Sequence, residues 1–364
     1  MNDTKAIRSG EELDSAKLAD FLSKTLDLDS NKIEISQFPA GASNLTYCVK
    51  FGEDEYVLRR PPFGNSVKSA HDMSREFNVL TKLSKVYEPA PKPILYCDNK
   101  NIIGSEFYLM ERRKGLIIRG KTALIQQAET RPQGSVQNLE NSPQLRKAVC
   151  KSFIENLADL HSLDFEKAGL GDLGKPEGYV KRQVEGWTKR YFKAKTDEHK
   201  ALEKAIVWLN ENIPADDPPA LVHNDYKFDN VMLNPEDLTE IVAVLDWEMA
   251  TIGSPLMDLG TTLAYWMSKE AGEEMLSMPF NPRVLMEHIS RSDLVEMYAA
   301  KSGRDISNIL YFYVFGTFKV AVIAQQIYYR FVKGFTKDKR FAKFGFFVRK
   351  LGEIGSVALK TQEL

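Results

Sequence analysis

The chain has 364 residues, 43% of them hydrophobic and 27% charged, which is ordinary for a globular protein with one large or two modest domains. Its net charge of −1 gives no general attraction to nucleic acid or to a membrane surface, and we expect neither as a partner. Three cysteines without a Cys-x-x-Cys pair argue against a disulfide framework or a zinc site, and the N-terminus does not read as a signal peptide, so we expect a cytoplasmic protein.

The first third of the sequence predicts an antiparallel sheet with one helix packed on it. An amphipathic helix comes first, with an apolar stripe of Leu13, Leu18, Phe21, Leu22 and Leu26. Alternating apolar residues then predict strands at 32–38, 44–51, 55–60, 94–97 and 102–110. The packed helix is expected at about 69–84, because Met73, Phe77, Leu80 and Leu83 fall on one side.

Helical patterns dominate the rest of the chain after a polar stretch at about 119–141. Ser142 and Pro143 form a typical helix start, and helices are expected at about 144–162, 177–195, 198–212, 259–268, 292–302 and 308–333. The last of these is strongly apolar but carries Lys319, which indicates a buried core helix rather than a membrane span. We therefore predict an α+β fold with an N-terminal lobe over residues 1–110 and a C-terminal lobe over 111–364.

One short motif indicates chemistry. His223, Asp225 and Asn230 follow the pattern H-x-D-x-x-x-x-N, and Asp246 ends the second apolar strand after it. Residues 231–233 and 241–245 predict the two strands of a hairpin, with a turn at 234–237, which brings Asn230 and Asp246 to the same end. One carboxylate to handle a hydroxyl proton and two oxygen ligands for Mg²⁺ are the parts that a phosphoryl-transfer site needs.

Each residue of this motif has an expected role. Asp225 orients the substrate hydroxyl and accepts its proton, while Asn230 and Asp246 bind Mg²⁺. Lys227 neutralises the transferred phosphoryl group. His223 is expected to pack beneath the loop and to hydrogen-bond its backbone, a structural role.

The motif and three further runs resemble a known superfamily. Residues 221–225, 243–248, 253–259 and 56–62 are similar to the aminoglycoside phosphotransferase and choline kinase superfamily, relatives of the protein kinases. The resemblance is strongest to the kinase-like domain fused to acyl-CoA dehydrogenase family members ten and eleven, and it extends over about residues 38–266. It implies a protein-kinase-like two-lobe fold and an ATP- and Mg²⁺-dependent transfer to a hydroxyl of a small molecule.

The resemblance also implies a nucleotide site. It assigns phosphate contacts to the turn residues Gly41, Ser43 and Asn44, and adenine contacts to the hinge residues Met110, Glu111 and Arg113. Arg59 stands where these kinases usually have a lysine, with Glu76 as its carboxylate partner. Strand alternation allows only one of Arg59 and its neighbour Arg60 to face the nucleotide, and the pattern favours Arg59. Asp258 is either a helix N-cap or, by the resemblance, a brace for the catalytic loop.

The acceptor is predicted from charge. Basic residues cluster at 112–121 and along the helix at 177–195, which favours an anionic acceptor. The resemblance to the dehydrogenase-linked kinases implies that this acceptor is a hydroxyacyl-CoA. An aminoglycoside or choline-like kinase and a nucleotide-binding pseudokinase scaffold are the alternatives. A protein kinase is disfavoured, because no Ala-Pro-Glu segment follows Asp246.

Overall fold

The computed structural model describes residues 3–27, 32–39, 44–63, 72–119, 139–267, 271–278, 281–336 and 338–364. The chain divides into two compact units, each described here by itself. The N-terminal unit is Met1–Gly115 together with Val242–Glu248, and the C-terminal unit is Leu116–Ile241 together with Met249–Leu364. The division differs from a single break after residue 110, because the short segment Val242–Glu248 belongs to the first unit.

The N-terminal unit contains one five-stranded antiparallel sheet in the order β1-β2-β3-β5-β4. The predicted strand at 102–110 is too long at its start. Gly104 has φ +83° in a turn closed by its amide and the carbonyl of Lys100, so pairing begins only at Phe107. The strands are β1 (Ile33–Gln37), β2 (Leu45–Phe51), β3 (Asp54–Arg60), β4 (Pro93–Cys97) and β5 (Phe107–Glu111).

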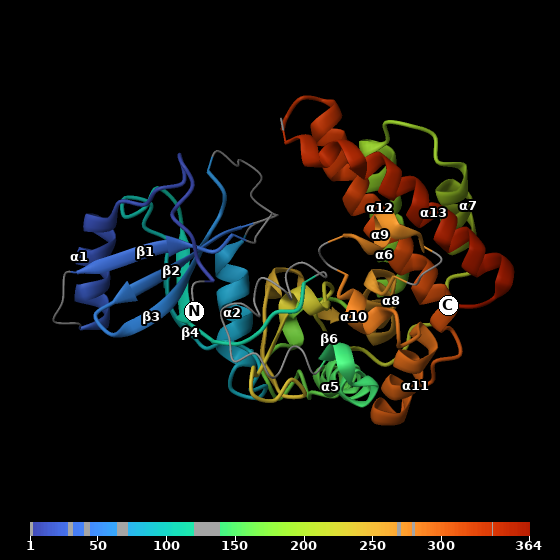
Figure 1. The fold of residues 1–364 in the computed structure, drawn as a ribbon, viewed down its shortest axis with the longest axis horizontal. Coiled ribbons are helices and arrows are strands. Elements are labelled where there is room, and N and C mark those ends of the chain that lie inside the picture. The colour runs from blue at the N-terminus through green and yellow to red at the C-terminus, as the bar shows by residue number, and fades with distance from the viewer. Residues whose placement is uncertain are drawn as a thin grey trace. The chain divides into compact units, whose positions relative to one another are not determined.

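A helix packs on each face of this sheet (Figure 1). The predicted amphipathic helix is α1 (Ser15–Leu26), capped by Asp14, and Leu18 and Leu22 join the apolar core on one face. The helix predicted at 69–84 is α2 (Met73–Leu83), capped by Asp72, and residues 69–71 lie outside the described residues. Its Phe77 contacts the rings of Tyr96 and Tyr108 on the other face, since side chains alternate along a strand.

The C-terminal unit is mainly helical. All six predicted helices are present within a few residues, and Ser142 caps the first of them through its hydroxyl, which accepts from the Leu145 amide. The α-helices are α5 (Pro143–His161), α6 (Tyr179–Ala194), α7 (Lys200–Glu211), α8 (Pro255–Tyr265), α9 (Glu273–Leu276), α10 (Arg283–Met286), α11 (Arg291–Ser302), α12 (Ile309–Val332) and α13 (Phe344–Thr361).

The described part of the chain also contains two two-stranded sheets. Strand β6 (Ala220–Val222) pairs antiparallel with β9 (Thr251–Gly253). Strands β7 (Val231–Leu233) and β8 (Ile241–Val244) form the predicted hairpin, whose turn is closed by the Asn234 amide and the Glu240 carbonyl. Short 3₁₀ turns occur at η1 (Gly171–Leu173), η2 (Phe228–Asn230), η3 (Trp247–Met249) and η5 (Lys339–Lys343).

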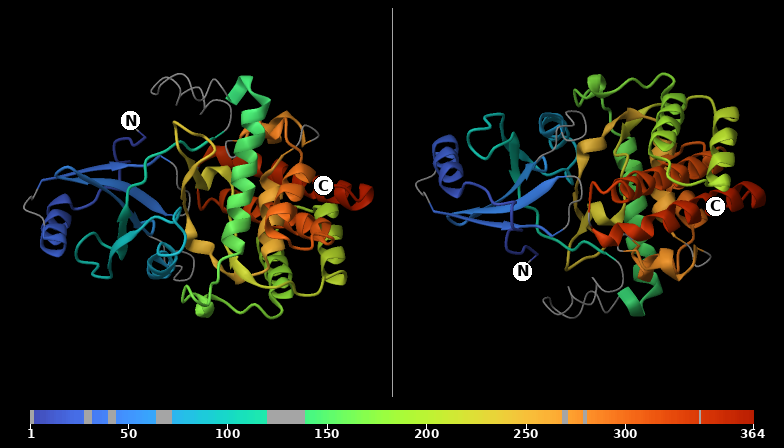
Figure 2. Two further views of the ribbon diagram at one scale, coloured as in Figure 1. Left: turned by 90° about the horizontal axis from the view of Figure 1, so that it is seen from below. Right: turned by 90° about the horizontal axis from the view of Figure 1, so that it is seen from above.

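Helix α12 forms the centre of the C-terminal unit. It packs against α6, α7, α8 and α13, and Figures 1 and 2 show α13 lying alongside it. It is long and apolar enough to cross a membrane, but 78% of its most apolar stretch is buried within the protein. This burial is what a core helix requires.

Candidate active site

The motif residues of the C-terminal unit meet around the carboxylate of Asp225. Its Oδ2 accepts hydrogen bonds from Lys227 Nζ at 2.7 Å and from Asn230 Nδ2 at 3.0 Å. Its Oδ1 accepts from the hydroxyl of Tyr265 in α8 at 3.0 Å. The sequence reasoning did not identify Tyr265. Three donors therefore fix the direction of the Asp225 carboxylate.

The backbone that carries Asp225 is held from below by Asp258. The buried Asp258 carboxylate accepts from the amides of His223 at 2.7 Å and Asn224 at 2.8 Å. The N-cap interpretation of Asp258 is wrong, because Ser254 caps α8, and the bracing role is confirmed. The Asp225 amide donates to His223 Nδ1 at 3.2 Å, so the structural role of His223 is also confirmed.

A second buried layer supports Asp258. Its Oδ2 lies 3.2 Å from Nε2 of His161, and Nδ1 of the same ring lies 2.8 Å from the hydroxyl of Tyr298. Burial lowers the pKa of His161, although Asp258 opposes the shift. The neutral ring then acts as a hydrogen-bonding support rather than as a charge.

Electrostatics keep Lys227 charged in this loop. Burial, the largest single influence, would lower the pKa of Lys227, but Asp225, Tyr265 and Asp229 together outweigh it and the pKa is raised. Burial, followed by Asp225, raises the pKa of Tyr265. At neutral pH the site therefore contains an ammonium and a phenol donor directed at one carboxylate.

The predicted residues of the N-terminal unit meet around Arg59. Its Nη1 lies 2.6 Å from Oε1 of Glu76, and its Nη2 lies 2.8 Å from Oδ1 of Asp246. Arg60 donates instead to the carbonyl of Ile103, so it is Arg59 that faces Glu76. The guanidinium is nearly buried, and Nε of Arg59 and Oε2 of Glu76 have no hydrogen-bond partner among the described residues.

Asp246 and Glu248 are two further acidic residues around this arginine. Asp246 has φ +70°, a strained backbone for a residue with a side chain. Glu248 accepts from Nδ2 of Asn44 at 2.6 Å. Burial, followed by the neighbouring Asp246, raises the pKa of Glu248 to about 8. Three acidic side chains around one arginine, with Glu248 largely protonated at neutral pH, form an environment that an added cation would stabilise.

Only some of the other residues predicted to bind the nucleotide lie among the described residues. Gly41 and Ser43 lie outside the described residues. Met110 is buried in β5 opposite Val57 of β3. The Arg113 side chain bonds Glu111 at 2.8 Å and Glu88 at 2.9 Å. The adenine contacts assigned to Glu111 and Arg113 stay predictions.

The two predicted metal ligands suit Mg²⁺ chemically. Asn230 uses its amide nitrogen toward Asp225, so its amide oxygen is the atom left for a metal, and Asp246 offers a carboxylate. Within the described ranges no three His, Cys, Asp or Glu side chains group around a possible metal position. Two hard oxygen ligands are what Mg²⁺ uses when phosphates and water complete its shell. Asn230 and Asp246 belong to different units, so their proximity stays a prediction.

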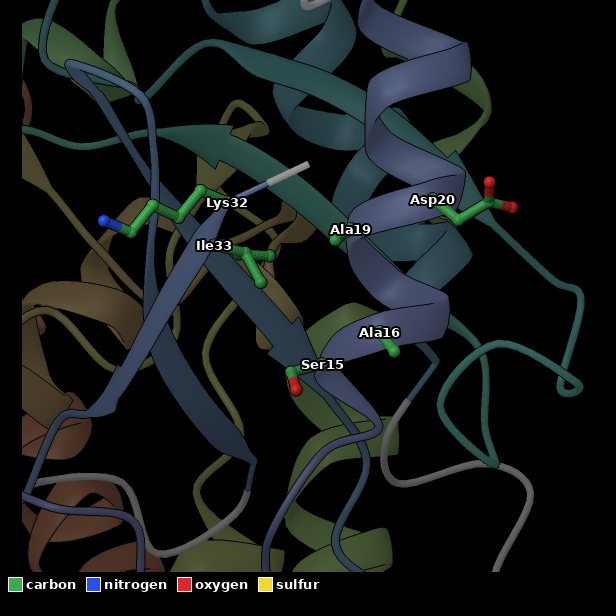
Figure 3. Close-up of a pocket in the computed structure, with 6 residues that line it drawn as sticks. All are labelled: Ser15, Ala16, Ala19, Asp20, Lys32 and Ile33. Atoms are coloured by element: carbon green, nitrogen blue, oxygen red, sulfur yellow. The ribbon is translucent and has the colours of Figure 1, made fainter. Parts of the chain in front are cut away.

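A cavity of about 430 Å³ lies elsewhere, between α1 and the start of β1 (Figure 3). Its lining residues are Ser15, Ala16, Ala19, Asp20, Lys32 and Ile33. None of them belongs to the predicted site.

Comparisons with known proteins show which family the chain resembles. Residues 34–278 match the model of the phosphotransferase enzyme family, APH. Acyl-CoA dehydrogenase family member 11 of Rattus norvegicus is 36% identical over 317 residues, which cover 83% of this chain and 37% of that protein. The chain therefore spans less than half the length of this curated relative.

The solved structures that resemble this chain are also phosphotransferases. A protein of Ralstonia eutropha assigned to the aminoglycoside phosphotransferases is 27% identical, with a TM-score of 0.77 over 96% of this chain and 99% of that one. The aminoglycoside phosphotransferase APH(4)-Ia, solved with AMP-PNP and hygromycin B, is 16% identical, with a TM-score of 0.58 over 93% and 99%. The chain thus has a protein-kinase-like α+β fold and belongs to the phosphotransferase enzyme family.

Proposed function

We propose that this chain is an ATP- and Mg²⁺-dependent kinase that phosphorylates a hydroxyl of a small anionic molecule, in its finer form a hydroxyacyl-CoA. The observation that carries the proposal is the Asp225 carboxylate, oriented by Lys227, Asn230 and Tyr265 at distances of 2.7 to 3.0 Å. Binding of AMP-PNP by APH(4)-Ia supports ATP as the phosphoryl donor.

The chemistry follows from the chain's own residues. The acceptor hydroxyl donates to Asp225, its oxygen forms a bond to the γ-phosphorus, and the bond from that phosphorus to the leaving ADP oxygen breaks. The hydroxyl proton passes to the Asp225 carboxylate. Lys227 places positive charge beside the transferred group. Mg²⁺ held by Asn230 and Asp246 would neutralise the phosphate oxygens.

Charge on α6 supports an anionic acceptor. Tyr179, at the first turn of α6, has its hydroxyl 3.3 Å from Oδ1 of Asn224, so this helix begins beside the catalytic loop. The exposed α6 cations Lys181, Arg182, Lys189 and Lys193 form no ion pair with a carboxylate in the described part of the chain. Such a surface attracts phosphates and repels a polycationic aminoglycoside.

The basic cluster at 112–121 gives less support than its sequence predicts. Arg112 bonds Asp3 and Glu55, and Lys114 bonds Glu55, so carboxylates of the same unit neutralise these groups. Lys121 lies outside the described residues. The hydroxyacyl-CoA proposal therefore depends on α6 and on the similarity to acyl-CoA dehydrogenase family member 11.

The test measures ADP release from ATP with hydroxybutyryl-CoA, choline, a sugar and kanamycin as acceptors. We expect turnover with hydroxybutyryl-CoA, and we expect Asp225→Asn to retain nucleotide affinity while it loses turnover by several orders of magnitude. Asp237→Asn, in the exposed hairpin turn, is the matched control and should behave as the wild type.

Each alternative has its own outcome. Turnover of kanamycin or choline with none of the acyl-CoA contradicts the charge argument. Nucleotide binding without turnover of any acceptor favours a pseudokinase scaffold, for which Arg59 in place of lysine is the supporting feature. Unchanged turnover in Asp225→Asn removes Asp225 from its assigned role.

A further inference from the structure

The backbone of Asn224, directly before Asp225, has a left-handed conformation. Asn224 has φ +67°, a region in which residues other than glycine are uncommon. Asp258 accepts from its amide, and its side-chain Nδ2 donates to the Met249 carbonyl at 3.1 Å. These contacts secure the amide side and the side chain. The carbonyl oxygen of Asn224 requires a partner of its own.

That partner is the ammonium of Lys319 in α12. Its Nζ donates to the Asn224 carbonyl oxygen at 2.7 Å, and Oγ1 of Thr261 lies 3.5 Å away. The Lys319 side chain also lies over the Trp187 ring of α6, at 5.8 Å from the ring centre. Only 2% of Lys319 is exposed. The bond to Asn224 is therefore its main polar contact in the described structure.

Close helix packing allows Lys319 to reach the loop. One turn before it, Gly316 meets Gly260 of α8 so tightly that a Cβ on Gly316 would lie 2.1 Å from the Gly260 carbonyl oxygen. Thr261, the next residue of α8, is the same residue that faces Lys319. The two glycines thus bring α12 against the helix that also carries Asp258 and Tyr265.

A buried ammonium at this position is costly. Burial lowers the pKa of Lys319 to about 8, with Asp258 of α8 and Asp225 opposing the shift and Lys227 and Arg190 of α6 adding to it. An apolar side chain would fill a helix core at lower cost. The ammonium bonds Asn224, the residue directly before the predicted catalytic carboxylate. This position indicates what offsets the cost.

We propose that Lys319 is a positioning residue, which fixes the Asn224–Asp225 peptide from the carbonyl side and so sets the direction of the Asp225 carboxylate. Asp258 and Lys319 then hold opposite polar groups of Asn224. Lys319 lies beyond residues 34–278, the part that matches the family model. The proposal rests on the proposed function, because it assumes that Asp225 acts on the acceptor hydroxyl.

The kinetic test compares Lys319→Met and Lys319→Arg with the wild type, using ATP and hydroxybutyryl-CoA. Lys333→Met, at the exposed end of α12, is the matched control. We expect Lys319→Met to lower kcat by about ten- to a hundredfold, because small misplacements of a catalytic group have effects of this size. The KM for ATP should change by less than about twofold. Lys319→Arg, which keeps a charged donor, should recover part of the loss.

The pH profile separates positioning from a merely structural role. Above about pH 8 Lys319 loses its proton, and the bond to Asn224 is no longer charge-assisted. The kcat of the wild type should therefore fall as the pH rises above about 8. This alkaline limb of the pH profile should be absent from Lys319→Met. Lys227 and Tyr265 have raised pKa values and titrate at higher pH.

Hydrogen–deuterium exchange gives a readout that does not require turnover. The amides of residues 223–227 should exchange faster in Lys319→Met and stay protected in Lys333→Met. A variant with lower thermal stability but unchanged kcat and loop protection would overturn the proposal. If the wild type turns over no acceptor, the proposed function fails, and the exchange result still decides whether Lys319 holds the loop. Should Lys319→Met not fold, the kcat and loop protection of Lys319→Arg decide it, together with the shift of its alkaline fall in kcat to higher pH.

Discussion

At the residue scale, Arg59 is the cation that Glu76 and Asp246, two carboxylates of the N-terminal unit, share. Glu76 is 1% exposed and also accepts from the Trp247 amide at 3.1 Å, so it cannot turn to water if Arg59 is lost. A charge left alone in such a place costs more than the pair gains when intact. Arg59 should therefore contribute both to the stability of the N-terminal unit and to the binding of an anion there.

We expect Arg59→Met to lower the free energy of unfolding by about 3–5 kcal/mol, because Glu76 becomes a buried charge without compensation. ATP affinity should fall in the same variant, and Arg59→Lys should retain part of both properties. Urea unfolding and titration calorimetry measure the two effects. Arg60→Lys, on the other face of β3, should leave ATP affinity unchanged. Full ATP affinity in Arg59→Met would show that Arg59 does not contact the nucleotide.

Spacing alone could predict site residues only within a short segment, while Arg59, Glu76 and Asp258 were predicted through the family resemblance. His223, Asp225 and Asn230 lie within one loop, so their spacing alone indicates their chemistry. Tyr265 lies 40 residues from its partner Asp225, and Lys319 lies 95 residues from Asn224. Their contacts depend on how α8 and α12 pack. In the sequence Tyr265 resembles an ordinary core residue, and Lys319 indicates only that its apolar helix is not a membrane span.

At the scale of elements, glycines decide both packing and predictability. Helix α13 was not predicted, since Gly345, Gly352 and Gly355 weaken its local helix propensity. All three glycines lie at close contacts. A Cβ on Gly345 would meet the Tyr328 ring at 3.0 Å, one on Gly352 would meet Leu202 of α7 at 3.1 Å, and one on Gly355 would meet Oγ1 of Thr317 at 2.9 Å. The residues that weaken the sequence signal are thus the ones that tertiary packing requires.

The α8–α12 contact provides a direct test. Gly316→Ala should destabilise the protein by about 1–3 kcal/mol or more, because the new methyl group meets the backbone of Gly260 and the helices must separate. Gly186→Ala is the matched control, since a Cβ there meets nothing within 4 Å in the described residues, and it should stabilise α6 by about 0.5–1 kcal/mol. Urea midpoints measure both, and equal midpoints would contradict the close packing.

At the scale of the whole molecule, the two predicted metal ligands belong to different units, so the metal should couple nucleotide binding to the stability of the folded protein. Ligands that bind only the folded state raise its stability, by about 2.7 kcal/mol at a hundred times Kd. We expect ATP with Mg²⁺ to raise Tm by several degrees and ATP with EDTA to raise it much less. Asp246→Asn should reduce the difference between the two. An equal shift with EDTA would mean that the nucleotide binds without the metal.

The membership of Val242–Glu248 in the N-terminal unit limits how the protein can be dissected. A fragment that ends after Gly115 would lack Asp246, one of the two carboxylates on Arg59, and Trp247, whose ring contacts Tyr87. Such a fragment would have a cavity in place of the Trp247 indole, and Arg59 would lose one of its two carboxylate partners. Recombinant expression of either half by a single cut should therefore give insoluble material, and a circular permutant that opens an exposed loop is the sounder route to separate the halves.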